Sequence, residues 1–233
     1  MLRFVYRSLV SLSILGCLLL APSPASADVI KFIDVGPEST VTVGGSIGSN
    51  YHGSVRAGEM EWEWVGTPPA GFAQSFYAYC VDLAHFVQPN QTVTPVSSTG
   101  FTNGVANGGS KAAWLFNQYA AGIHALGDTA TAAINAAALQ IAIWEAMYDT
   151  TRDLSSGGFT VSAGSSVLYR ANQYLTALYN SDMTSVATIL NASGTYGGQD
   201  QIVRQVSEPS TLLLLGLAFF GFATLTRRQT KVS

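Results

Sequence analysis

Residues 130–148 read ATAAINAAALQIAIWEAMY, and this stretch decides how the rest of the chain is interpreted. Its apolar side chains recur every three or four residues, which is the period of an amphipathic helix. Asp128 or Thr129 can cap the start of that helix. The predicted apolar face also holds Gln140, whose amide needs a hydrogen-bond partner if it is buried. Two explanations stay open: Gln140 has a special role, or it bonds a neighbouring backbone.

The chain before this helix has the period of a β-strand. Residues 28–88 are expected to be rich in strands, and apolar and acidic side chains alternate in MEWEWV at 60–65. This alternation predicts a half-buried strand with a solvated acidic face. That face carries the glutamates at 59, 61 and 63, and Met60, Trp62 and Trp64 point the other way.

More helix signals follow the strands. Residues 89–109 are expected to form a polar loop, and 201–206 either close the sheet or act as a stalk. Helices are predicted at 110–121, 130–148 and 165–180, with a short helical piece at 184–190. The fold class is therefore expected to be α+β, with an N-terminal β-rich sandwich or barrel and an inserted or following helical subdomain.

The N-terminus is typical of a secretory signal peptide. Arg3 and Arg7 precede an apolar run at 9–21, and Ala25-Ser26-Ala27 has small residues at the two positions that define a cleavage site. Residues 1–27 are therefore expected to be removed, leaving a mature extracellular domain at 28–193 and a linker at 194–206.

The C-terminus predicts a membrane segment. Residues 207–211 read SEPST, and an apolar run at 212–225 follows. At about 1.5 Å per residue this run covers only about 20 Å of a hydrocarbon core roughly 30 Å thick, so its flanks are needed for a single membrane-spanning helix. Arg227 and Arg228 form a basic stop that stays in the cytoplasm.

This tail resembles the PEP-CTERM sorting signal of exported proteins in Gram-negative bacteria. The residues that carry the resemblance are Ser207, Glu208, Pro209, Arg227 and Arg228, with Ser207 standing where the family has proline. The resemblance implies processing by exosortase, a membrane protease. It also implies a precursor held in the inner membrane by its C-terminal helix, and then a place at the cell surface or in an extracellular matrix.

Charge excludes some partners for the mature domain. Residues 28–206 contain six Lys and Arg residues and thirteen Asp and Glu residues, a formal charge of −7. An acidic surface without a basic patch argues against nucleic acid or an anionic membrane as a partner of this domain.

Cys80 becomes the only cysteine once Cys17 leaves with the signal peptide. A lone cysteine in an exported protein is a buried thiol, an intermolecular link or a reactive group. Asp82 and His85 follow closely and could tune its proton or that of an incoming nucleophile, although strand alternation puts Asp82 on the face of Cys80 and His85 on the other.

Two short motifs in the body resemble the thioester domains of bacterial surface adhesins. Tyr79 precedes Cys80, and sixty residues later Gln140 is followed by Ala142 and Trp144, with Leu139 in place of the usual threonine. The resemblance implies that the Cys80 sulfur joins the Gln140 side-chain carbonyl in an environment of Tyr79, Asp82, Ala142 and Trp144. It implies adhesion by covalent attachment to a surface amine or hydroxyl.

The alternative is a non-catalytic matrix or carbohydrate-binding module with a buried, free Cys80. Such a module would present exposed rings, most plausibly Trp62 or Trp64. No conventional enzyme is expected, because no set of nucleophile, acid and base is visible. No cofactor is expected either, and His52, His85 and His124 lack metal-ligand spacing.

Overall fold

The computed structural model describes residues 28–46, 53–179, 185–193 and 197–205. The predicted signal peptide and the predicted C-terminal membrane helix lie outside these residues. Among the residues that are described, no helix is both long and apolar enough to cross a membrane.

Strands and helices follow one another in a mixed order. The strands are β1 (Asp28–Gly44), β2 (Gly53–Trp64), β3 (Ser75–Cys80), β4 (Asn90–Ser97), β5 (Thr160–Ser162), β6 (Thr188–Ser193) and β7 (Gln201–Val203). The helices are a short 3-10 turn η1 (Ser98–Gly100), α2 (Gly108–His124), α3 (Ala130–Tyr148) and α4 (Ser165–Tyr179). All three long helices therefore lie between β4 and β6 in the chain, as an insertion into the sheet.

The strands form one antiparallel sheet that closes on itself. Its order is β2-β3-β7-β6-β4-β1-β5, and β1 also pairs with β2. The first part of β1 pairs with β4 on one side and with the end of β2 on the other, whereas its last residues pair with β5. Closure satisfies the backbone groups that an open sheet would leave unpaired at its edges. The expected β-rich part is present as one large antiparallel sheet, and residues 201–203 form a strand of it, which is one of the two roles that the sequence left open.

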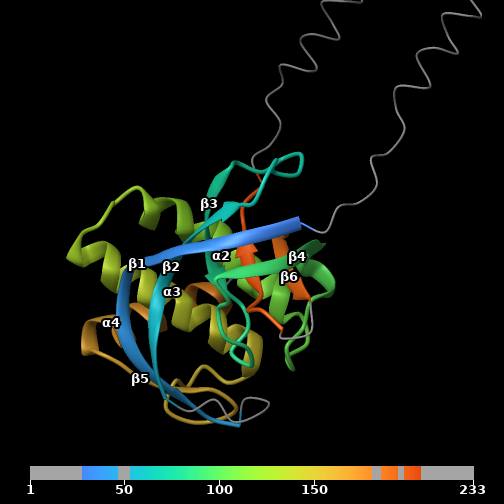
Figure 1. Ribbon diagram of the computed structural model, residues 1–233. Helices are drawn as coiled ribbons and strands as arrows, with labels where there is room; N and C mark the ends of the chain where they lie inside the picture. The colour runs from blue at the N-terminus through green and yellow to red at the C-terminus, as the bar shows by residue number, and fades with distance from the viewer. Residues whose placement is uncertain (1–27, 47–52, 180–184, 194–196, 206–233) are drawn as a thin grey trace, which may run out of the picture.

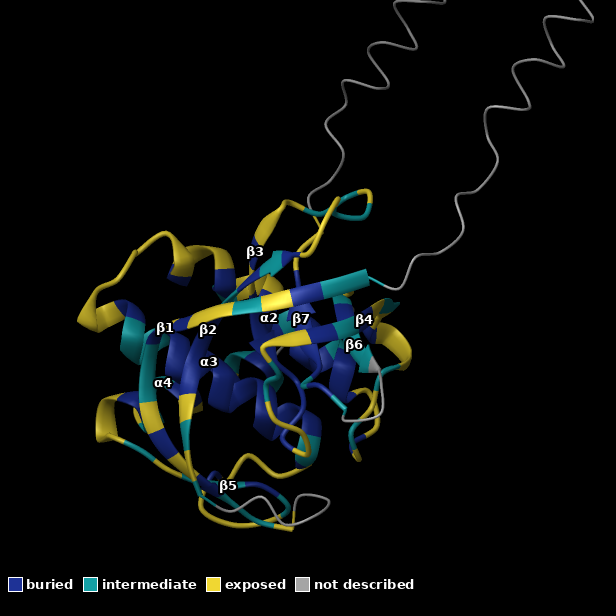
Figure 2. Ribbon diagram, in the orientation of Figure 1, coloured by how far each residue is buried: buried dark blue, intermediate teal, exposed yellow. Residues whose placement is uncertain are grey.

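Helix α3 is the centre of the helical layer. It packs against β1 and β2 and between α2 and α4, as Figure 1 shows. Every residue from Ala136 to Met147 is buried, so most of α3 has the buried colour in Figure 2. The sequence predicted one apolar face, but between Ala136 and Met147 the helix is enclosed on all sides, because its many alanines let neighbouring elements approach closely.

Several local predictions are confirmed. Helix α3 has the expected bounds, and the Thr129 hydroxyl caps it by accepting a hydrogen bond from the Ala132 N–H at 3.1 Å. Helices α2 and α4 lie where helices were expected. Two predictions were wrong: the polar segment 89–109 contains β4, and the expected helical piece at 184–190 overlaps β6.

The acidic face of β2 is only partly solvated. Trp62 and Trp64 are buried, as the alternation predicts. Glu59, however, is 1% exposed and its carboxylate contacts the His124 imidazole Nδ1 at 2.9 Å. His124, the last residue of α2, reaches this glutamate, which the sequence of β2 alone could not indicate. The two buried tryptophans also cannot form the exposed carbohydrate platform that was considered.

Candidate functional site

The Gln140 side chain and Cys80 meet directly. Cys80 is the last residue of β3 and Gln140 lies in the middle of α3. The Cys80 N–H donates to Gln140 Oε1 at 2.9 Å, and Gln140 Nε2 donates to the Cys80 carbonyl at 2.7 Å. The two bonds fix which way the amide points, because its oxygen needs a donor and its nitrogen needs an acceptor. The pairing also places the Gln140 carboxamide beside the residue that carries the thiol.

The Cys80 sulfur lies in a turn made by the next two residues. The thiol donates to the Asp82 carbonyl at 2.7 Å, and the Asp82 N–H donates back to Sγ at 3.2 Å. Cys80 is 1% exposed and Gln140 is equally buried. Water therefore has little access to the sulfur or to the amide.

Burial and charge both disfavour the thiolate. Burial raises the pKa of the Cys80 thiol well above its usual value, and the nearby Asp82 carboxylate raises it further. The Trp144 indole opposes this rise, although its N–H has no hydrogen-bond partner that meets normal geometry. The thiol consequently keeps its proton at neutral pH, and Trp144 supplies a spare donor next to the sulfur.

Asp82 links the sulfur to a polar network. Its carboxylate accepts hydrogen bonds from the Ala84 N–H at 2.7 Å and from the Tyr148 hydroxyl at 3.3 Å. The same carboxylate lies 2.6 Å from the Nδ1 atom of His85. Tyr148 also accepts from the Leu83 N–H at 2.8 Å, so α3 holds the turn after β3 at a second point.

The structure corrects the expected positions of His85 and Tyr79. Strand alternation put His85 and Asp82 on opposite faces, but β3 ends at Cys80 and the chain turns, so the two side chains meet. Tyr79 lies on the other face of β3 from Cys80, where its ring packs edge-on to Phe116 with centroids 6.1 Å apart. Ala142 is buried in α3.

Two members of the site, Asn103 and Asp200, were not predicted from the sequence. Asn103 donates to the Val81 carbonyl at 2.8 Å and to the Tyr148 hydroxyl at 3.3 Å. Asp200 accepts from the Ala192 N–H, its backbone carbonyl accepts from the Val81 N–H, and burial raises the pKa of its carboxyl to about 6. Tyr148 carried a signal, since it lies two helical turns after Gln140 on the same face, whereas Asn103 and Asp200 come from loops without a pattern.

Among the residues that the structure places, no group of three His, Cys, Asp or Glu side chains could hold a metal ion.

A comparison with models of known protein families identifies the C-terminal segment of the chain. Residues 205–228 match the family model described as the PEP-CTERM protein-sorting motif. The chain carries a PEP-CTERM sorting motif. It marks an exported protein that exosortase, a membrane enzyme, processes at the membrane. No curated protein and no solved structure matches the chain, so the likeness of its body to thioester domains stays a prediction.

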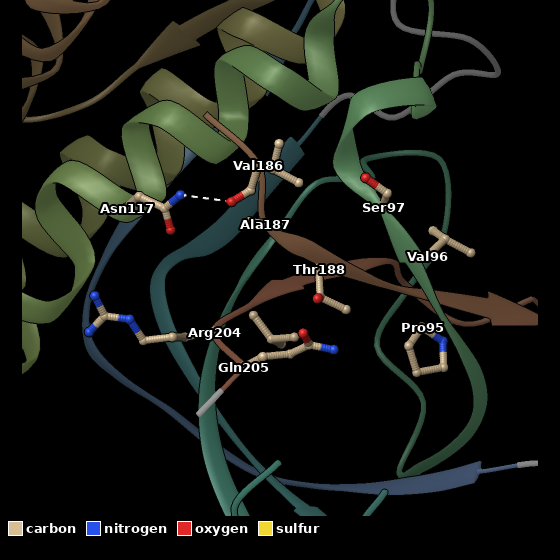
Figure 3. Close-up of a pocket in the computed structure, with 10 residues that line it drawn as sticks. Pro95, Val96, Ser97, Asn117, Val186, Ala187, Thr188, Arg204 and Gln205 are labelled. Carbon is tan, nitrogen blue, oxygen red and sulfur yellow. Dashed lines mark hydrogen bonds between the residues drawn. The ribbon is translucent and has the colours of Figure 1, made fainter. Parts of the chain in front are cut away.

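The body of the protein is hollowed where the match to the PEP-CTERM motif begins. An open cavity of about 510 Å³ lies among α2, β4, β6 and the residues after β7. Figure 3 shows Arg204 and Gln205 lining it, together with Asn117, whose amide donates to the Val186 carbonyl at 3.0 Å. This cavity contains none of the residues around Cys80.

Proposed function

We propose that this PEP-CTERM protein is a surface protein that attaches itself covalently through a thioester between Cys80 and Gln140. One observation carries the proposal: the buried Gln140 amide is paired with the backbone of the lone mature cysteine, sixty residues away in the chain. The sequence resemblance to thioester domains predicted a meeting of these two residues.

The groups around Cys80 suit thioester formation. The Cys80 sulfur attacks the Gln140 side-chain carbonyl carbon, a C–S bond forms, and the C–N bond breaks. The thiol proton leaves with the amide nitrogen as ammonia, so no outside base is consumed. The Cys80 N–H already bonds the oxygen that becomes negative in the tetrahedral intermediate, which is the arrangement of an oxyanion hole. The unpaired Trp144 N–H favours any thiolate character on the sulfur.

The same burial would protect the bond once formed. A thiol whose pKa is raised is a poor leaving group, and a dry site slows attack by water. The thioester would therefore persist until a target amine or hydroxyl reaches Gln140. That attack gives an amide or ester on Gln140 and returns Cys80 as a free thiol.

Sorting and attachment fit together. The motif at 205–228 directs the exported chain to exosortase at the membrane. A covalent bond from Gln140 then joins the mature domain to a component of the cell surface or of an extracellular matrix. In this proposal the protein reacts once and does not turn over, so it is not an enzyme.

The alternative of a non-covalent module has one favourable observation. Both polar atoms of the Gln140 amide are hydrogen-bonded, so a structural latch between α3 and β3 would explain its burial without any chemistry. Methylamine separates the two functions. The thioester predicts a methylamide on Gln140 and a free Cys80 thiol, both mapped by peptide mass spectrometry, and none in Cys80→Ala. A latch predicts an unmodified Gln140 in every sample.

A further inference from the structure

We propose that His85, held by Asp82, is the general base that activates the target, and that the target is therefore a hydroxyl group. This inference rests on the proposed thioester function. It goes beyond it by choosing between the two classes of nucleophile that can open a thioester.

The position of His85 is fixed on two sides. Its Nδ1 atom lies 2.6 Å from the Asp82 carboxylate, which is itself 3% exposed. On another edge, a Cβ added at Gly197 would lie 2.9 Å from the imidazole Cδ2 and 3.3 Å from Nε2, so the backbone there packs against the ring. With Nδ1 engaged, Nε2 is the nitrogen left to accept a proton. About half of the side chain is exposed, so a target can reach it.

His85 is connected to the reacting sulfur through one residue. The backbone of Asp82 bonds Cys80 Sγ through both its N–H and its carbonyl, and the side chain of Asp82 holds the imidazole. The base and the sulfur therefore sit on one short turn. The imidazole and the half-buried Tyr148 hydroxyl are both bonded to this turn, and of the two the imidazole is the group that can accept a proton.

The carboxylate beside His85 sets the orientation of its ring. Asp82 also keeps the ring in the tautomer that leaves Nε2 unprotonated.

The proposed step balances without any further reactant. The hydroxyl oxygen of the target bonds to the Gln140 acyl carbon while its proton moves to His85 Nε2. The C–S bond breaks, and the proton passes from the imidazolium to the Cys80 sulfur. The products are an ester on Gln140, a free thiol and a neutral His85.

The base matters for hydroxyls far more than for amines. An amine in its free form attacks a thioester without help, whereas a neutral hydroxyl is a weak nucleophile until its proton is removed. A positioned base typically contributes about 10²–10⁴-fold to such a step. A His–Asp pair at the site is therefore of little use for an amine target, but of great use for a polyol or sugar surface.

The chain provides a matched control. His124 has the same type of contact, from Nδ1 to the buried Glu59 carboxylate at 2.9 Å, and its side chain is about as exposed. It lies on the opposite face of β3 from Cys80, near Tyr79. Replacement of His124 should therefore disturb a comparable surface pair and leave the thioester site intact.

The test compares wild type, His85→Gln and His124→Gln by intact mass spectrometry, with glycerol and methylamine as nucleophiles. We expect ammonia loss in all three proteins. In His85→Gln the rate of glycerol ester formation should fall by about 10²-fold or more, while methylamide formation changes less than about threefold. His124→Gln should match wild type with both nucleophiles.

Each other result has a definite meaning. Absence of ammonia loss in wild type overturns the proposed function itself. An intact thioester with an unchanged glycerol rate in His85→Gln overturns only the role of His85. An equal fall with glycerol and methylamine also overturns it, because His85 would then merely hold the site in shape.

Discussion

Opening the proposed thioester should weaken the fold by an amount that the loop length sets. The bond joins residues sixty apart in sequence. If it stabilises as other covalent cross-links do, by restricting the unfolded chain, a loop of that length contributes about 4 kcal/mol. Methylamine would remove the cross-link but restore an amide at Gln140, so the two hydrogen bonds to Cys80 could form again. Most of the loss would therefore reflect the cross-link, with a smaller part from the methyl group added at this buried site.

Thermal and urea unfolding of the mature domain, before and after methylamine, measure this loss. For a domain of this size we expect Tm to fall by roughly 8–16 °C. Gln140→Ala serves as the control, because it cannot form the bond and should not respond to methylamine. Equal Tm values for treated and untreated wild-type protein would refute the cross-link, whatever the geometry around Cys80.

Three further predictions concern the fold and the tail. Burial raises the pKa of Glu145 from 4.5 to about 7, so its contribution to stability should fall as pH rises between these values, by up to about 3 kcal/mol. Urea titrations at pH 5 and 8 should show a smaller loss of stability in Glu145→Gln than in wild type, with the remainder due to Asp200. Gly109→Ala should destabilise the fold by about 1–3 kcal/mol, because its Cβ would overlap the Ser98 and Phe101 carbonyl oxygens. Gly122→Ala in the same helix is the control, because its Cβ would meet no atom and should not destabilise the fold. Equal urea unfolding midpoints for the two variants would contradict this prediction. Replacing Arg227 and Arg228 with glutamate should leave unprocessed precursor in a blot of membrane fractions, and normal processing would show that the basic stop is not needed.

The elements that the sequence predicted best are those whose hydrophobic period and end signals both lie within their own residues. Helix α3 is an example, because the Thr129 cap and the run of helix-forming residues agree. Strand β7 is short, yet its apolar residues next to a Gly-rich segment were enough to foresee that it could close the sheet. Strands β4 and β6 were missed because polar residues and turn formers conceal them, and only their pairing with each other, from Thr92 to Ser97, makes them strands.

The candidate site could be predicted in part. Cys80 and Gln140 stood out because one is the lone mature cysteine and the other is a polar residue on an apolar helix face. Their contact depends on how α3 lies over the end of β3, which no local pattern specifies. The pairing of Asp82 with His85 was missed because alternation holds only while the strand continues, and β3 stops at Cys80.

The most direct test of the account is the intact mass of freshly purified mature domain. A thioester between Cys80 and Gln140 predicts a mass below that of the sequence by one ammonia, about 17 Da, since the sulfur displaces the amide nitrogen. The deficit should be absent in both Cys80→Ala and Gln140→Ala. A wild-type mass equal to that of the unmodified chain would contradict the central claim and leave Gln140 as a structural latch.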